Sequence, residues 1–166
     1  MASCSGREQS LRWLYGNPND GTVKLTGRLP SADANYSGTL WKFESAGDEN
    51  TFNIKCLATP SNSQHVYLEA SGNDNVRLDD EGTSGNDNAK WIIEQASDAA
   101  DLYYPQNPWD GQGELFTFFV KNFNPALDDN LLYGNPENGF VDLAVKENTD
   151  WTGVHWLILV PISLNS

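Results

Sequence analysis

The chain has 166 residues, of which 39% are hydrophobic and 11% aromatic, enough for one hydrophobic core of ordinary domain size. Its formal charge is -13 with only ten Lys and Arg residues, which excludes the clustered positive charge used to bind nucleic acid or anionic membranes. No apolar run approaches the roughly 20 residues that span a bilayer, and the start MASCSGREQS lacks the regions of a secretory signal, so we expect one domain (1–166), cytoplasmic or released without a signal peptide, and no membrane insertion.

The first predicted element is a hairpin that the sequence contains three times. LYGNPNDGTVKL at 14–25 and LYGNPENGFVDL at 132–143 are identical at eight of twelve positions, and VYLEASGNDNVRL at 66–78 has the same outline. Asn, Asp and Pro favour a turn, Gly21 and Gly139 can take a positive φ, and Val-x-Leu alternates apolar side chains toward one face. A threefold repeat of hairpins is therefore predicted.

Each hairpin is followed by a polar loop and a strand that contains a tryptophan, 16, 13 and 13 residues after the Leu of Val-x-Leu. Two further strands, TFNIKCLAT from Thr51 and LFTFFVKNF from Leu115, precede the second and third hairpins. No segment keeps a helical period, so the chain is expected to be all-β, with Trp41, Trp91 and Trp156 in the core. Only thirteen residues precede Leu14, so the first unit opens either with a very short strand in ASCSG or with an irregular segment.

Three units of four strands, about 1–46, 47–98 and 114–166, with an insertion at about 99–113, resemble a β-trefoil. The sequence DNAKW, Asp87 to Trp91, is similar to the Asp-Asn-x-x-Trp pattern of the ricin B-like and fungal β-trefoil lectins. The resemblance implies a β-trefoil with three pseudo-symmetric repeats and a lectin without catalysis. It further implies a neutral glycan or glycoprotein partner, of galactose or N-acetylgalactosamine type, and leaves open whether the chain forms a homodimer.

Candidate sugar-binding residues lie in the hairpin turns and in the loops before the tryptophans. An aromatic ring packs on the apolar face of a sugar while Asp and Asn bond its hydroxyls. The candidates in the first unit are Tyr15, Asn17, Asn19, Asp20 and Tyr36; in the second Asn73, Asp74, Asn75, Asp87 and Asn88; and in the third Asp129, Asn130, Tyr133, Asn135, Asp150 and Trp151.

The sequence contains few residues arranged for catalysis or for metal binding. His65 and His155 have no motif partner, so structural imidazoles are favoured over a general base, and we expect neither an enzyme nor a cofactor. Cys4 and Cys56 can form one disulfide, but free thiols in a reducing compartment are favoured. The acidic segment 78–88 suits calcium in its oxygen ligands but does not follow the EF-hand spacing, so a solvated loop is favoured over a metal site.

The insertion contains Tyr103, Tyr104 and Trp109 between Asp, Pro and Gly residues. Such a loop is either an interaction surface or a cap folded back over the open end of a barrel. Trefoils also include protease inhibitors, so the alternative hypothesis is a protease inhibitor that presents Tyr103 to Gly113 to an enzyme. A scaffold or interaction module is a third reading, because a fold alone does not assign a function.

Overall fold

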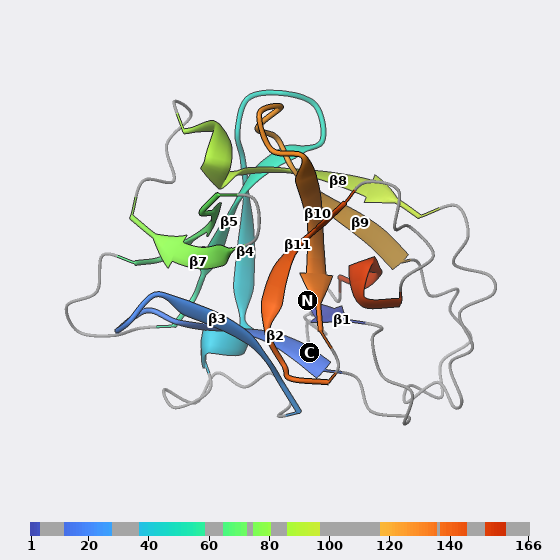
Figure 1. Ribbon diagram of the computed structural model, residues 1–166. Coiled ribbons are helices and arrows are strands. Elements are labelled where there is room, and N and C mark those ends of the chain that lie inside the picture. The colour runs from blue at the N-terminus through green and yellow to red at the C-terminus, as the bar shows by residue number, and fades with distance from the viewer. Residues whose placement is uncertain are drawn as a thin grey trace, which may run out of the picture.

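The computed structural model of the protein describes residues 1–3, 12–27, 37–58, 65–72, 75–80, 86–96, 117–135, 137–145 and 152–158. Within these ranges the chain is all-β, as predicted, with antiparallel strands, short 3-10 helices and no α-helix (Figure 1). No helix of the described ranges is long and apolar enough to span a membrane. The strands are β1 (Ala2–Ser3), β2 (Arg12–Asn17), β3 (Thr22–Thr26), β4 (Trp41–Ser45), β5 (Thr51–Cys56), β6 (Tyr67–Ala70), β7 (Val76–Asp79), β8 (Lys90–Gln95), β9 (Thr117–Asn122), β10 (Asp129–Gly134), β11 (Val141–Val145) and β12 (Trp156–Leu157).

The strands form one long antiparallel ladder and three hairpins. One antiparallel ladder runs β1–β12–β9–β8–β5–β4, and three hairpins, β2–β3, β6–β7 and β10–β11, branch from it. Each hairpin pairs through its first strand with the ladder strand that precedes it in the sequence, as β1–β2, β5–β6 and β9–β10. The same order of four strands therefore occurs three times along the chain.

The first unit does open with a very short strand. Ala2 and Ser3 form β1, which pairs with β12 on one side and with β2 on the other. Met1 is buried in the core, and its carbonyl accepts a hydrogen bond of 3.0 Å from the Leu14 backbone N–H. Long-range pairing, rather than any local strand pattern, therefore defines this element.

The three hairpins touch one another around the centre of the view in Figure 1. The Leu78 N–H donates to the Gly21 carbonyl, and the Leu25 N–H donates to the Gly139 carbonyl, both at 2.8 Å. Gly21, Gly72 and Gly139 have φ of 76°, 82° and 78°, a left-handed backbone that side chains with a Cβ resist. The positive φ predicted for Gly21 and Gly139 is confirmed. The carbonyl groups of these same two turn glycines join neighbouring hairpins.

The core is built from equivalent residues of the three units. The Val and Leu of each Val-x-Leu segment are buried in it, as the alternation predicts. Trp91 and Trp156 are fully buried, whereas Trp41 is partly buried and packs against the same core. Each indole N–H donates to the carbonyl of a leucine in the first hairpin strand of its own unit: Trp41 to Leu14 (3.0 Å), Trp91 to Leu68 (2.8 Å) and Trp156 to Leu132 (2.8 Å).

Candidate functional site

Each unit has a junction, the place where the first hairpin strand meets the 3-10 helix that precedes the unit's tryptophan. These helices are η1 (Ser37–Thr39), η2 (Asp87–Ala89) and η4 (Thr152–Val154), and they contact β2, β6 and β10 respectively. The strand residue at each junction directly follows the leucine that binds the indole. The three junction residues are Tyr15, Glu69 and Tyr133, and their cross-strand neighbours are Lys24, Arg77 and Asp142.

Glu69 makes the second junction unlike the others, because a carboxyl group is buried there. Its side chain is only 9% exposed. The Asn86 Nδ2 donates to Oε1 at 3.0 Å, and the Arg77 Nη2 donates to Oε2 at 3.4 Å. Burial raises the pKa of Glu69. Burying a carboxyl group costs more free energy than burying an apolar side chain, even when the group is hydrogen-bonded. Buried ionisable groups with a shifted pKa are frequent at functional sites, so Glu69 marks a candidate site.

Asp79 shares a nitrogen of the Arg77 guanidinium with Glu69. The same Nη2 donates to its Oδ2 at 2.6 Å, and the Asp80 N–H donates to its Oδ1 at 2.7 Å. Hydrogen bonds with Asp80 and with Glu69, together with the Arg77 charge, lower the pKa of Asp79 to about 2. The carboxyl groups of Glu69 and Asp79 therefore have opposite pKa shifts and share one guanidinium. Two carboxylate acceptors thus lie close to the amide donor of Asn86 and the guanidinium donor of Arg77.

Tyr67 supplies an aromatic ring beside these groups, since it pairs directly with Asp79 across the hairpin. Its hydroxyl donates to the Glu44 Oε2 at 3.0 Å, and the Lys55 Nζ lies 5.4 Å from the centre of its ring. Lys42 donates to the other Glu44 oxygen at 2.9 Å, which is the main reason why the pKa of Glu44 is lowered. The ring is thus fixed in position by residues of β4 and β5.

Asn86 joins the second junction to η2. While its Nδ2 bonds Glu69, its Oδ1 accepts from the Asn88 N–H at 3.1 Å and caps the 3-10 helix. The predicted residue Asp87 follows on the exposed side and accepts from the Lys90 Nζ at 2.8 Å. Asp87 therefore adjoins Asn86 in the chain, and its side chain bonds Lys90.

Asn88 and Asn75 were also predicted as sugar-binding residues. In the structure they form hydrogen bonds with residues other than Glu69. The Asn88 carbonyl accepts from the Asn122 Nδ2 at 2.7 Å, and its Oδ1 accepts from the Asn124 Nδ2 at 2.6 Å. Asn75 is exposed, and its carbonyl accepts from the Ser71 N–H at 2.7 Å within the hairpin turn. Neither residue shares a hydrogen bond with Glu69.

The predicted residues of the first hairpin bond one another within the turn. The Asn17 Nδ2 donates to the Asp20 Oδ2 at 2.8 Å, and its Oδ1 accepts from the Asn19 N–H at 3.1 Å. The Asp20 Oδ1 accepts from both the N–H and the hydroxyl of Thr22, and these bonds lower the pKa of Asp20. Tyr15 lies apart from them at the junction, with the Lys24 Nζ 5.5 Å from the centre of its ring.

In the third unit the predicted residues are divided between the turn and the core. The Asn135 Oδ1 accepts from the Glu137 N–H at 2.9 Å and holds the turn. Tyr133 is partly buried against a small apolar cluster, and burial raises its pKa. Asn130 lies at a bulge that follows Asp129, and its buried Oδ1 has no hydrogen-bond partner among the described residues.

Several predictions fall on residues outside the described ranges or, for Asp129, on a side chain that is not described although its strand is. These are the candidate side chains of Tyr36, Asn73, Asp74, Asp129, Asp150 and Trp151, and the whole insertion 99–113 with its aromatic residues. The protease-inhibitor alternative depends on that insertion and stays a prediction.

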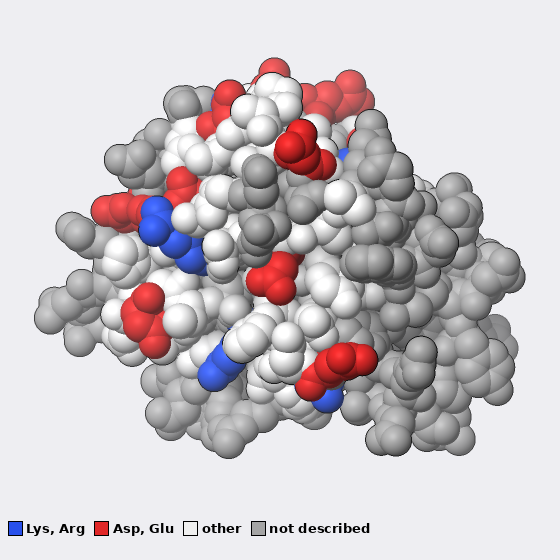
Figure 2. Space-filling view, in the orientation of Figure 1, with Lys and Arg blue, Asp and Glu red and all other residues white. Residues whose placement is uncertain are grey.

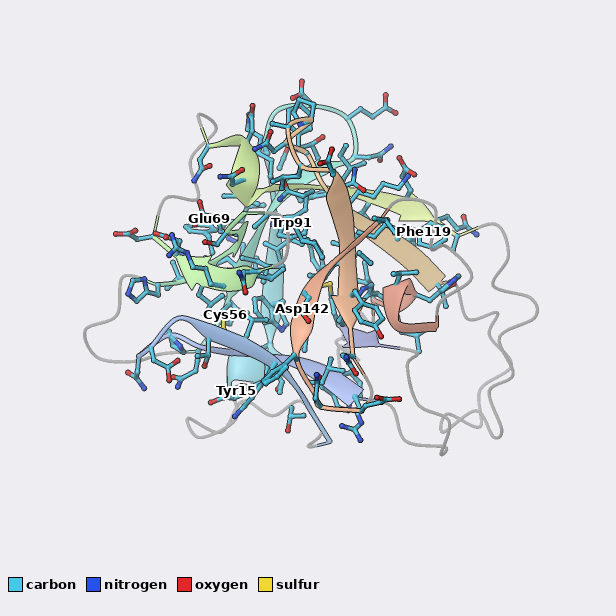
Figure 3. All side chains as sticks on the ribbon, viewed as in Figure 1. Tyr15, Cys56, Glu69, Trp91, Phe119 and Asp142 are labelled. Atoms are coloured by element: carbon cyan, nitrogen blue, oxygen red, sulfur yellow. The ribbon has the colours of Figure 1, made fainter. Side chains whose placement is uncertain are left out.

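The structure therefore gathers a different set of residues from those predicted. Tyr67, Glu69, Arg77, Asp79 and Asn86 lie together at the second junction, and none of them was a candidate. One sequence signal points to this place: an alignment of the hairpins puts a lone glutamate where the other copies have tyrosine. Figure 3 shows Glu69 on a different hairpin from Tyr15 and from Asp142.

The other reactive residues of the described ranges have structural surroundings. His155 is buried beside Thr117, with its ring 4.9 Å from that of Phe119. Cys56 is a free thiol in the core, and burial raises its pKa. No group of three His, Cys, Asp or Glu residues in the described part of the chain could hold a metal ion.

No protein-family model matches the chain, and no curated protein sequence matches it. The function must therefore be argued from the chemistry of the second junction.

The lowered pKa of Asp79 predicts a specific pH dependence of stability. Ionised Asp79 stabilises the fold at pH values above its ordinary pKa of 3.8, and this contribution is lost as the pH falls through about 2. We expect Asp79→Asn to lower the free energy of unfolding by about 1–2 kcal/mol at pH 6, with the difference from the parent shrinking toward pH 2. Urea unfolding between pH 2 and pH 6 measures this difference. The exposed Asp128→Asn is the control and should change the profile little; a pH-independent effect of Asp79→Asn would contradict the account.

Proposed function

We propose that the protein is a β-trefoil lectin that binds a neutral glycan at its second junction and has no catalytic activity. The trefoil is supported by the threefold order of strands, by the equivalent hydrogen bonds from Trp41, Trp91 and Trp156, and by the mutual contacts of the three hairpins. In such a fold the ladder strands form a barrel and the hairpins cover one of its ends.

The buried carboxyl group of Glu69 carries the functional proposal. Sugar hydroxyls both donate and accept, so they pair with the carboxylates of Glu69 and Asp79 and with the amide and guanidinium groups of Asn86 and Arg77. Tyr67, fixed beside them with the Lys55 Nζ 5.4 Å from its ring centre, supplies an aromatic ring of the kind on which sugars stack.

Charge favours a neutral ligand. The chain carries a net charge of -13, and acidic side chains are spread over the face shown in Figure 2 with few basic ones between them. A sulfated or sialylated glycan would be repelled by this field, whereas galactose or N-acetylgalactosamine would not. These two sugars are therefore the class that we propose.

Hydrolysis of the bound sugar is disfavoured by the geometry of the two carboxyl groups. Glycosidases place a sugar bond between two carboxyl groups, one of which acts as acid. Here Glu69 and Asp79 hydrogen-bond each other as well as the same nitrogen of Arg77, so their carboxyl groups are too close together for a sugar bond to lie between them. The arrangement therefore suits binding.

A glycan array tests the proposal. Folded protein should retain glycans that end in galactose or N-acetylgalactosamine, and Glu69→Gln should lose this retention because a neutral amide cannot replace the charged acceptor. The matched control is Glu94→Gln, since Glu94 lies on β8 and pairs with Lys121 away from the junction. If the folded parent retains no glycan at high concentration, carbohydrate binding is refuted. If Glu69→Gln binds like the parent, the assignment to the second junction is wrong.

A further inference from the structure

The three junctions differ in a correlated way at two positions. The strand residue is tyrosine in the first and third units and Glu69 in the second. The residue three positions before the tryptophan, at the centre of each 3-10 helix, is glycine in the first and third units and asparagine in the second: Gly38, Gly153 and Asn88. Tyrosine therefore occurs with glycine, and glutamate with asparagine.

Direct contact explains the pairing of tyrosine with glycine. A Cβ atom on Gly38 would lie 2.8 Å from the Tyr15 Cε2 and still closer to the Gly16 carbonyl oxygen. A Cβ atom on Gly153 would lie 2.7 Å from the Tyr133 Cδ2. Such distances are too short for real Cβ atoms, so each ring edge already lies against the backbone of the 3-10 helix.

Neighbouring residues complete this filling of the first and third junctions. Lys24 lies near the face of the Tyr15 ring, with its Nζ 5.5 Å from the ring centre. Tyr133 packs against the apolar cluster that includes Leu131 and Val154. In both units the tyrosine thus occupies the space between hairpin and helix.

The second junction has no ring in the corresponding place. Glu69 there meets Asn86 through a hydrogen bond of 3.0 Å, and the Asn88 side chain bonds Asn124 instead of the hairpin. Polar atoms therefore meet between β6 and η2, where the other junctions place a tyrosine against a glycine.

We infer that, of the three junctions, only the second forms a sugar site, and that Tyr15 and Tyr133 close the equivalent positions of the other two units. This inference rests on the proposed function and adds its valency. One such site per chain makes each chain a monovalent binder, which holds one glycan end.

Isothermal titration of the full chain with N-acetylgalactosamine and with galactose tests the valency. The parent should bind one sugar per chain, and Glu69→Gln should weaken all of the binding about tenfold or more, because no second site remains. Tyr15→Phe, Tyr133→Phe and Trp151→Ala should keep the parent's affinity and stoichiometry.

The outcomes separate the inference from the function on which it rests. Two or three sugars per chain, binding of unchanged affinity that survives in Glu69→Gln, or a loss in Trp151→Ala would overturn the single site while keeping the lectin. Absence of binding by the folded parent to either sugar, and to every glycan of the array, would overturn both.

A double variant tests closure directly. Glu69→Tyr with Asn88→Gly installs the tyrosine and glycine of the other two units. We expect this variant to fold, as judged by its thermal unfolding, and to lose sugar binding. Parent-like affinity in the folded double variant would refute closure by tyrosine. If the double variant does not fold, the stoichiometry of the parent decides the question, since open first and third junctions would each bind a further sugar.

Discussion

Trp91→Ala is expected to lower the free energy of unfolding by about 3–5 kcal/mol, the usual cost of deleting a large buried aromatic side chain. Trp91 is fully buried in the central core, and its indole N–H bonds the Leu68 carbonyl at 2.8 Å. The substitution therefore opens a cavity and leaves a buried carbonyl without its donor. Urea unfolding followed by circular dichroism measures the loss.

The equivalent substitution in the first unit is the natural control for Trp91. Trp41 donates the same kind of bond, to Leu14 at 3.0 Å, but it is only partly buried. Trp41→Ala should therefore cost clearly less than Trp91→Ala. Equal losses at the two positions would contradict the difference in burial on which the prediction depends.

Gly153→Ala is expected to lower the free energy of unfolding by about 1–3 kcal/mol, as overpacking does in well-filled interiors. The added Cβ would lie 2.6 Å from the Gly134 carbonyl oxygen and also meet the ring of Tyr133. A backbone oxygen cannot move aside as a flexible side chain can, so η4 has to shift away from β10. Thermal and urea unfolding both report the change.

Gly27→Ala is the matched control for Gly153→Ala. Gly27 follows β3, and a Cβ added there would meet nothing within 4 Å. It should leave the stability nearly unchanged. A Gly153→Ala variant as stable as Gly27→Ala would show that the third junction is not tightly filled, and would weaken the argument that Tyr133 closes it.

The fold was largely readable from the sequence because its signals are local and repeated. Turn glycines, the alternating Val-x-Leu segments and the regularly spaced tryptophans predict the hairpins and the core strands that the structure contains. The strand β1 could not be predicted with equal certainty, because Ala2 and Ser3 have no strand pattern and are ordered by β2 and β12.

The candidate site was harder to read because turn formation and sugar binding use the same residue types. Asn17, Asp20 and Asn135 have the side chains that bind hydroxyls, but in the structure they bond the backbone or side chains of their own turns. Glu69, by contrast, belongs to the site but has no local signal that predicts its burial. In the sequence it is an outward-facing strand residue, and its burial depends on Asn86, which is 17 residues further along the chain.

A nitrogen-15 NMR titration of the protein with N-acetylgalactosamine shows whether the second junction binds the sugar. We expect saturable shifts of the amide signals of Glu69, Arg77 and Asp79 and of the Asn86 side chain, with none of comparable size at Tyr15 or Tyr133. Shifts centred on the first or third junction, or no shifts at saturating sugar, would contradict this expectation.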